Sequence, residues 1–175
     1  MKQVVPVLTL LLIAGLLLPN LGQDRVVAGD DKKIEMVTVK MKDLLTHIDK
    51  QKGKVVVIDL WAMFCVPCKA EFHNLVDLHH RYGKDGLVCM SLNLDDIPDL
   101  KKLAPGFLRD KKAMFANFWL EEGIDGAQKH WKFEPIPVVV VYGRDGKLAR
   151  VFNNNDPCKD AFTYKQVEDL VKKLL

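Results

Sequence analysis

The chain has 175 residues, a length typical of one domain. Hydrophobic residues make up 49% of it and charged residues 28%, so it can bury a core and does not have the composition of a disordered segment. The net charge is only +3 with lysine and arginine spread along the chain, and the cysteines number four. These figures argue against a nucleic-acid partner, a disulfide-stabilised mini-protein and a multi-span membrane protein.

The N-terminal stretch has the layout of a secretory signal. Between Lys2 and Asp24 the chain carries no charge and is rich in leucine. Residues 4–22 are also long enough to cross a bilayer, which takes roughly 18 residues or more, and could tether the protein. We therefore expect residues 1–28 to be a signal peptide or an uncleaved membrane anchor. Either role places a domain of residues 29–175 outside the cytoplasm, where thiols meet oxidants.

Hydrophobic periodicity predicts strands that alternate with helices from residue 34 onward. Continuous apolar runs rich in β-branched residues predict strands that are buried on both faces of a sheet. In chain order we expect a strand at 34–39, a helix at 43–52, a strand at 54–60, a helix from 65 to about 82, a strand at 87–92, a helix from about 95 to 108, a strand at 114–120, a helix at 124–132, strands at 137–142 and 148–152, and a helix from 163 onward.

Local signals sharpen several of these boundaries. Asp145-Gly146 predicts the turn of a β-hairpin between the last two strands. Thr163 and Gln166 fit a capping box at the start of the last helix. Pro105-Gly106 is expected to bend or split the helix that contains it. With no internal repeat or linker, the pattern predicts one α/β domain.

Two cysteines, Cys65 and Cys68, stand where a buried strand ends and a helix begins. At this spacing their Cα atoms can come within the ~4.4–6.8 Å that a disulfide needs. The amides and dipole of the helix N-terminus favour a thiolate at Cys65, and Pro67 is tolerated in a first helical turn. We expect Cys65 to be the exposed nucleophile and Cys68, one turn deeper, to resolve the mixed disulfide.

Two other interpretations of the pair are a zinc half-site and a structural disulfide. Structural zinc needs four ligands, and Cys89, Cys158 and the five histidines offer no second paired spacing. A disulfide that closes so short a loop would stabilise the fold little. We therefore expect a redox pair, with no metal and no organic cofactor. Cys89 is expected to be a buried, inert thiol. Cys158 is expected to be exposed, where it either pairs between chains or persists as a thiol, and nothing in the sequence supports a bond between Cys89 and Cys158.

Two segments of the sequence resemble those of a known family. Residues 57–69, VIDLWAMFCVPCK, resemble the thioredoxin active-site segment, and Glu134-Pro135-Ile136-Pro137 resembles the cis-proline loop of that fold. An extra helix and strand lie between them, at 96–120. With the N-terminal export segment, this layout resembles the TlpA/ResA-like extracytoplasmic thiol–disulfide oxidoreductases. The resemblance implies a thioredoxin-like fold, with a central mixed β-sheet flanked by helices and an inserted helix–strand element.

The resemblance also implies roles for single residues. Pro137, after Ile136, would be the cis-proline, beside which the backbone binds extended substrate. Asp59 would be a buried acid beneath the cysteines, its pKa raised by desolvation, which takes the proton of Cys68. The alternative for Asp59 is a carboxylate that meets solvent or a lysine at the strand end. Trp61 would pack against the thiols and shield them.

Departures from the family pattern limit what can be carried over. Val66 replaces the glycine or proline that is common between the cysteines, and Met63-Phe64 replace a common Glu-Trp or Thr-Trp. Because these residues surround the thiolate, no relative's reduction potential applies here. His73 stands where relatives often have a proline kink, which allows a straighter helix.

The leading hypothesis is an enzyme that exchanges disulfides with protein substrates, as a reductant of exported thiol proteins such as cytochrome c apoproteins, supplied by a membrane electron donor. An oxidant of the same fold would carry the same cysteine pair. A thiol peroxidase is a further alternative, although its usual active-site threonine is missing before Cys65. A non-enzymatic copper-binding or partner-binding module is the last, although copper chaperones of this fold typically use CxxxC.

Overall fold

The computed structural model describes residues 34–155 and 161–175, so the predicted signal or anchor segment and Cys158 lie outside the described residues. Within these two ranges, no helix has the length and apolar character to cross a bilayer. The strands, all in one sheet, are β1 (Met36–Val39), β2 (Val55–Trp61), β3 (Leu87–Asn93), β4 (Ala116–Leu120), β5 (Val138–Tyr142) and β6 (Leu148–Phe152).

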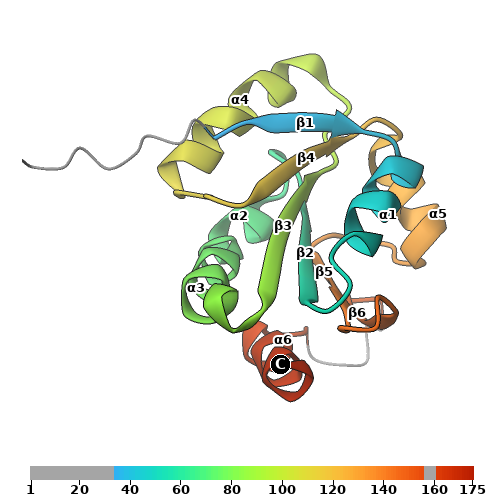
Figure 1. The fold of residues 1–175 in the computed structure, drawn as a ribbon. Coiled ribbons are helices and arrows are strands. Elements are labelled where there is room, and N and C mark those ends of the chain that lie inside the picture. The colour runs from blue at the N-terminus through green and yellow to red at the C-terminus, as the bar shows by residue number, and fades with distance from the viewer. Residues whose placement is uncertain (1–33, 156–160) are drawn as a thin grey trace, which may run out of the picture. The chain divides into compact units, whose positions relative to one another are not determined.

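The sheet is mixed and has the strand order β1-β4-β3-β2-β5-β6 (Figure 1). The first four strands in this order run parallel to one another, whereas β5 pairs antiparallel with both β2 and β6. The predicted α/β class, the mixed sheet and the final hairpin are therefore confirmed. β2 lies in the interior of the sheet with both neighbours paired, which is why its sequence is a continuous apolar run with every residue buried.

Helices cover both faces of the sheet. They are α1 (Met41–Asp49), α2 (Val66–Glu71), α3 (His73–Tyr82), α4 (Pro98–Asp110), α5 (Gly123–Trp131) and α6 (Tyr164–Leu174). Figure 1 shows α1 and α5 on one side of the sheet and α2 and α3 on the other. Each predicted helix is present, so the alternation of strands and helices is confirmed.

Alternate residues of β2 point into two different cores. Val56 and Ile58 join the core that is closed by α1 and α5. Val55 and Val57 join the core that is closed by α2, α3, α4 and α6, which also contains Trp61 and both active-site cysteines. Because side chains alternate along a strand, Asp59 faces the second of these cores, on the side of the cysteines.

The inserted helix–strand element predicted at residues 96–120 is confirmed as α4 and β4. Pro105 was expected to bend or split this helix. It does not split the helix, because α4 runs through Pro105 as one helix. Ala104 and Leu108 on this helix are fully buried in the core. Their tertiary packing holds the helix together where one backbone donor is missing.

The helix that follows the cysteines is broken at Phe72, so the straighter helix that His73 would allow is not formed. His73 Nδ1 lies 2.8 Å from the carbonyl of Ala70, and Asn74 Nδ2 donates to the carbonyl of Glu71 at 3.0 Å. Side chains thus occupy backbone acceptors at the break, and such local hydrogen bonds compete with the helical ladder. The Phe72 side chain is fully buried, with its ring 5.4 Å from that of Trp61 and 5.2 Å from that of Phe107.

The C-terminal helix is fixed at both ends. The predicted capping box is present at its start, where Thr163 and Gln166 satisfy each other's backbone amides. Near its end, the Arg144 guanidinium in the β5–β6 turn donates to the carbonyls of Leu174 (3.2 Å) and Leu175 (2.6 Å). Arg144 also donates to the carbonyls of Gly53 (3.0 Å) and Asp85 (3.2 Å), so one side chain joins the helix to two other chain segments.

Candidate active site

Cys65 and Cys68 form a disulfide at the start of α2, with their Cα atoms 5.3 Å apart, as the spacing predicted. The strand β2 ends at Trp61, and Cys65 is the N-cap of the helix, with Pro67 in the first turn. The backbone N–H of Cys68 donates to Cys65 Sγ at 3.2 Å. A main-chain donor is thus already aimed at the sulfur that would carry a thiolate.

The expectation that Cys65 is exposed is wrong for the disulfide form. Its relative exposure is 5%, against 1% for Cys68. The cause is local, because Cys65 Sγ is bonded to Cys68 and held over the first turn of α2 by the Cys68 amide. The exposed surface beside it belongs to its neighbours Phe64 (52%) and Val66 (71%), which are both apolar.

Asp59 is buried in β2, with a relative exposure of 2%. The Tyr164 hydroxyl donates a hydrogen bond to its Oδ2, while Oδ1 has no hydrogen-bond partner among the described residues. Burial raises the pKa of Asp59 to about 7; the Tyr164 hydrogen bond opposes this rise, and the nearby Glu71 charge adds to it. The predicted desolvated acid is confirmed, and the alternative of a carboxylate paired with solvent or lysine is wrong.

A cavity of about 150 Å³ joins the acid to the disulfide. It brings together three residues that the sequence analysis singled out, Asp59, Cys68 and Pro137. The full lining is Asp59, Cys68, Glu71, Pro137, Val139, Phe162, Thr163 and Tyr164. Asp59 and Cys68 therefore line the same cavity.

The peptide bond between Ile136 and Pro137 is cis, as expected from the resemblance. Ile136 is half-buried and packs against both cores. Trp61 is fully buried, with its ring 5.4 Å from the ring of Phe72 and 4.9 Å from that of Phe107. Trp61 shares its core with Cys65 and Cys68, and its role in shielding the thiols stays a prediction.

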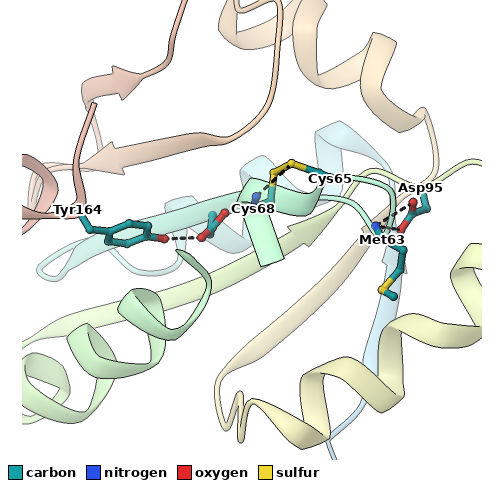
Figure 2. Close-up of a disulfide and its surroundings, with 6 residues drawn as sticks. Met63, Cys65, Cys68, Asp95 and Tyr164 are labelled. Carbon is teal, nitrogen blue, oxygen red and sulfur yellow. Dashed lines mark hydrogen bonds between the residues drawn. A yellow bond between two sulfur atoms is a disulfide. The ribbon is translucent and has the colours of Figure 1, made fainter. Parts of the chain in front are cut away.

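Asp95 is a part of the site that the sequence analysis did not single out. It is fully buried, and its carboxylate accepts the backbone N–H of Met63 at 2.8 and 3.1 Å and Asn93 Nδ2 at 2.7 Å. Figure 2 shows the disulfide between these bonds on one side and Tyr164 on the other. A signal did exist: Asp95 follows a strand parallel to β2, and parallel strands end at the same edge of a sheet.

Tyr164 and Glu71 were also missed as site residues. Glu71 follows Cys68 by three residues, a spacing that places both on one side of a helix and could have indicated it. Tyr164 lies 105 residues from Asp59 in sequence, and no local pattern connects the two. The prediction for Cys89 is confirmed, because it is a buried free thiol whose pKa is raised by burial.

The described part of the chain contains no cluster of three His, Cys, Asp or Glu side chains that could hold a metal ion. The groups present at the site are two sulfurs, the buried carboxylic acid of Asp59 and the hydrogen-bond donors of Cys68 and Tyr164.

Comparison with known proteins places this geometry in context. The thiol:disulfide interchange protein HelX of Rhodobacter capsulatus is 28% identical over 103 residues, which cover 59% of this chain and 54% of HelX. The thiol-disulfide oxidoreductase ResA of Oceanobacillus iheyensis is 28% identical over 68 residues, 39% of this chain and 35% of that protein. ResA of Bacillus thuringiensis is 24% identical over 144 residues, 81% of this chain and 71% of that protein. The chain thus spans only about a third to a half of the first two relatives.

Solved structures show the same fold. A putative thiol:disulfide interchange protein DsbE from Chlorobium tepidum superposes with a TM-score of 0.59 at 21% identity, covering 73% of this chain and 84% of that one. The thioredoxin-like superfamily protein SPOA0173 gives a TM-score of 0.60 at 14% identity. The predicted thioredoxin-like fold is therefore confirmed. A family model matches residues 31–158, most of the chain, and the protein accordingly belongs to the AhpC/TSA family.

Proposed function

We propose that this protein is a thiol–disulfide oxidoreductase that exchanges disulfides with protein substrates through Cys65 and Cys68. The observation that carries the proposal is the Cys65–Cys68 disulfide at a helix start, with the buried acid Asp59 and the cis-proline Pro137 on one cavity. The names of the relatives support it, since HelX is a thiol:disulfide interchange protein and ResA a thiol-disulfide oxidoreductase.

The reaction begins with the reduced pair. The Cys65 thiolate attacks one sulfur of a substrate disulfide, and the other substrate sulfur leaves as a thiolate. A mixed disulfide then joins Cys65 to the substrate. The Cys68 amide, 3.2 Å from Cys65 Sγ in the oxidised form, stabilises the negative charge on that sulfur at the N-terminus of the helix.

The second step releases the substrate. The Cys68 thiol passes its proton to the Asp59 carboxylate, and the Cys68 thiolate attacks Cys65 Sγ. The bond between Cys65 and the substrate breaks, and the second substrate sulfur leaves as a thiolate. Two electrons pass from the cysteine pair to the substrate, and the pair ends as the disulfide. Because the pKa of Asp59 is about 7, the acid can both accept and return this proton near neutral pH.

The proposal also covers the direction of electron flow and the cellular location of the protein. We assign the protein as a reductant of exported thiol proteins, recharged by a membrane dithiol donor. The uncharged residues 4–22 support a location outside the cytoplasm, as a signal or a tether ahead of the domain at 29–175. The exposed apolar side chains of Phe64 and Val66 beside the disulfide support protein substrates.

Reduction of an insulin disulfide by the dithiothreitol-recharged protein tests the activity. Cys65→Ser is expected to abolish turnover, and Cys68→Ser to accumulate a mixed disulfide on Cys65. The matched control Cys89→Ser removes a buried thiol and is expected to leave the rate unchanged. Turnover that persists in Cys65→Ser contradicts the proposal, and Cys65-dependent peroxide consumption without disulfide exchange replaces it with a thiol peroxidase.

The reduction potential of the pair, from equilibration with thiol buffers, tests the direction. A value near that of thioredoxin, about −270 mV, supports a reductant. A value near that of DsbA, about −120 mV, reverses the assignment to an oxidant.

A further inference from the structure

The carboxylate beneath the disulfide has a single hydrogen-bond donor among the described residues, and that donor comes from the far end of the chain. The Tyr164 hydroxyl, on the first residue of α6, donates to Asp59 Oδ2. Figure 2 shows the Tyr164 ring directed toward Cys68. The arrangement leaves Oδ1 as the oxygen available to take a proton, on a cavity that Cys68 also lines.

The neighbours of Asp59 within the sheet offer it no charge. In the register of the sheet, Asp59 lies beside Ser91 of β3 and Val139 of β5. The Ser91 hydroxyl donates to Asn117 Oδ1 at 2.7 Å, so its proton is directed elsewhere. The charged form of Asp59 therefore depends on groups that the helices bring to it.

Titratable side chains from three other elements face Asp59, and they affect its charge differently. Glu71 of α2 raises the pKa of Asp59 through charge repulsion, and Cys89 of β3 is a buried thiol whose own pKa is raised. From α6, Tyr164 lowers the pKa of Asp59 by donating to it. Burial raises the pKa of Tyr164 itself well above its ordinary value, so the hydroxyl stays protonated and remains a donor.

We propose that Tyr164 is a positioning residue of the exchange reaction, whose hydroxyl holds the Asp59 carboxylate beneath Cys68 and sets the pH at which Asp59 accepts the Cys68 proton. This inference rests on the proposed function, because it assigns Tyr164 to the second, resolving step of that reaction. The cavity of about 150 Å³ that Asp59 and Cys68 both line is large enough to hold water, since one water needs only about 10–15 Å³ by this measure, so water can carry the proton between them.

The backbone places Tyr164 independently of its hydrogen bond. The capping box of Thr163 and Gln166 fixes the first turn of α6, and Val167 and Val171 anchor the helix in the core. Removing only the hydroxyl, with Tyr164→Phe, is therefore expected to leave the ring in place and to remove the donor alone.

Tyr82 provides a matched control. Its hydroxyl also donates to a carboxylate on α6, at 2.6 Å to Glu168 Oε1, but this bond does not involve Asp59. Tyr82→Phe thus removes the same kind of bond between the body of the domain and the same helix. A merely structural effect of losing such a bond would be shared by both variants.

The test follows the reaction of the reduced protein with 5,5′-dithiobis(2-nitrobenzoate), in a Cys158→Ser background so that the thiol outside the described residues does not react. Attack by Cys65 releases one coloured thiolate, and attack by Cys68 on the resulting mixed disulfide releases the second. The second phase, recorded from acid to alkaline pH, reports the resolving step alone. The Asp59 carboxyl is titrated in parallel by ¹³C NMR of the oxidised protein.

Tyr164→Phe is expected to move the midpoint of the second phase about one pH unit upward, and to slow it about tenfold below neutral pH, because a lost hydrogen bond to a charged group is worth about that much. At alkaline pH the second-phase rate of Tyr164→Phe is expected to equal that of the protein that retains Tyr164, because the Asp59 carboxylate then forms without the donor. The NMR titration of Asp59 is expected to move in the same direction. Tyr82→Phe is expected to move neither readout.

Three outcomes overturn the inference: an unchanged midpoint in Tyr164→Phe, a second phase slowed equally at every pH, or the same shift in Tyr82→Phe. The variant Asp59→Asn distinguishes a failure of the inference about Tyr164 from a failure of the proposed function. If Asp59→Asn slows the second phase and Tyr164→Phe does not, only the role of Tyr164 fails. If the protein with tyrosine at position 164 shows neither phase, the proposed function itself fails.

Discussion

The backbone N–H of Met63 donates to both carboxylate oxygens of Asp95, at 2.8 and 3.1 Å. This contact attaches the loop before Cys65 to the chain just beyond β3, on the side of the disulfide away from Tyr164 (Figure 2). The carboxylate is buried and also accepts a hydrogen bond from Asn93. The active-site loop is therefore held by a buried acid as well as by the helix that follows it.

Replacing Asp95 with alanine is expected to destabilise the protein by about 2–3 kcal/mol, because two buried donors, on Met63 and Asn93, lose a charged acceptor. Urea unfolding of the oxidised protein measures the loss. The neighbouring Asp96 is exposed, and Asp96→Ala serves as the control with an expected change within about 0.5 kcal/mol. Equal effects of the two substitutions would show that the Met63–Asp95 hydrogen bonds add nothing to the free energy of unfolding.

Stability is expected to fall as pH rises between 3.8, the ordinary pKa of Asp59, and about 7, its pKa in the folded protein. In this window the folded protein retains a proton that the unfolded chain has lost. Each rise in pH therefore stabilises the unfolded state relative to the folded state and lowers the free energy of unfolding. Glu168, whose pKa is lowered to about 2, has the opposite effect, but at more acid pH, between about 2 and 4.5.

Asp59→Asn removes the carboxyl group whose ionisation destabilises the folded protein. The variant is expected to be more stable than the native sequence above neutral pH, by an amount on the order of a few kcal/mol, while its resolving step slows. Denaturant unfolding on either side of the window gives the comparison. A native protein whose Asp59-dependent stability rises with pH across the same window would contradict the buried, raised pKa.

Arg144→Ala is expected to cost about 1–2 kcal/mol, because four backbone carbonyls, including those of Leu174 and Leu175, lose one shared donor group. Thermal unfolding and amide exchange in α6 measure the effect. Arg144→Lys keeps the charge but loses the planar fork, and is expected to recover only part of the loss. Full recovery by lysine would mean that charge, not the forked geometry, holds the C-terminus.

Phe64→Ser is expected to slow exchange with a protein disulfide more than exchange with a small disulfide, because an exposed apolar side chain beside Cys65 contacts only the larger substrate. Stability should change little, since the side chain is already exposed. Leu148→Ser, at a similarly exposed position on β6, is the control. Loss of reactivity toward both disulfides alike would assign Phe64 to the cysteine chemistry instead of to substrate contact.

Much of the fold could be predicted because its signals are local. The apolar run of β2, the Asp145-Gly146 turn and the capping box at Thr163 each occupy consecutive or nearly consecutive residues. The redox pair is also local: the spacing of Cys65 and Cys68, at a strand end, allows a disulfide across a first helical turn, and that disulfide is formed. The burial of Asp59 beneath the cysteines was predicted from the resemblance to the thioredoxin active-site segment, and alternation along β2 explains it.

Tertiary structure decided the features that depend on segments distant in sequence. Nothing near Asp59 indicates that Tyr164, 105 residues away, supplies its hydrogen bond, and nothing near Met63 indicates Asp95. The slight exposure of Cys65 and the break at Phe72 likewise follow from packing and side-chain hydrogen bonds that override local propensity. The sequence by itself determined where the cysteines and the acid lie along the chain. Only the folded structure, by bringing the first residue of α6 to Asp59, determined that the Tyr164 hydroxyl donates a hydrogen bond to that acid.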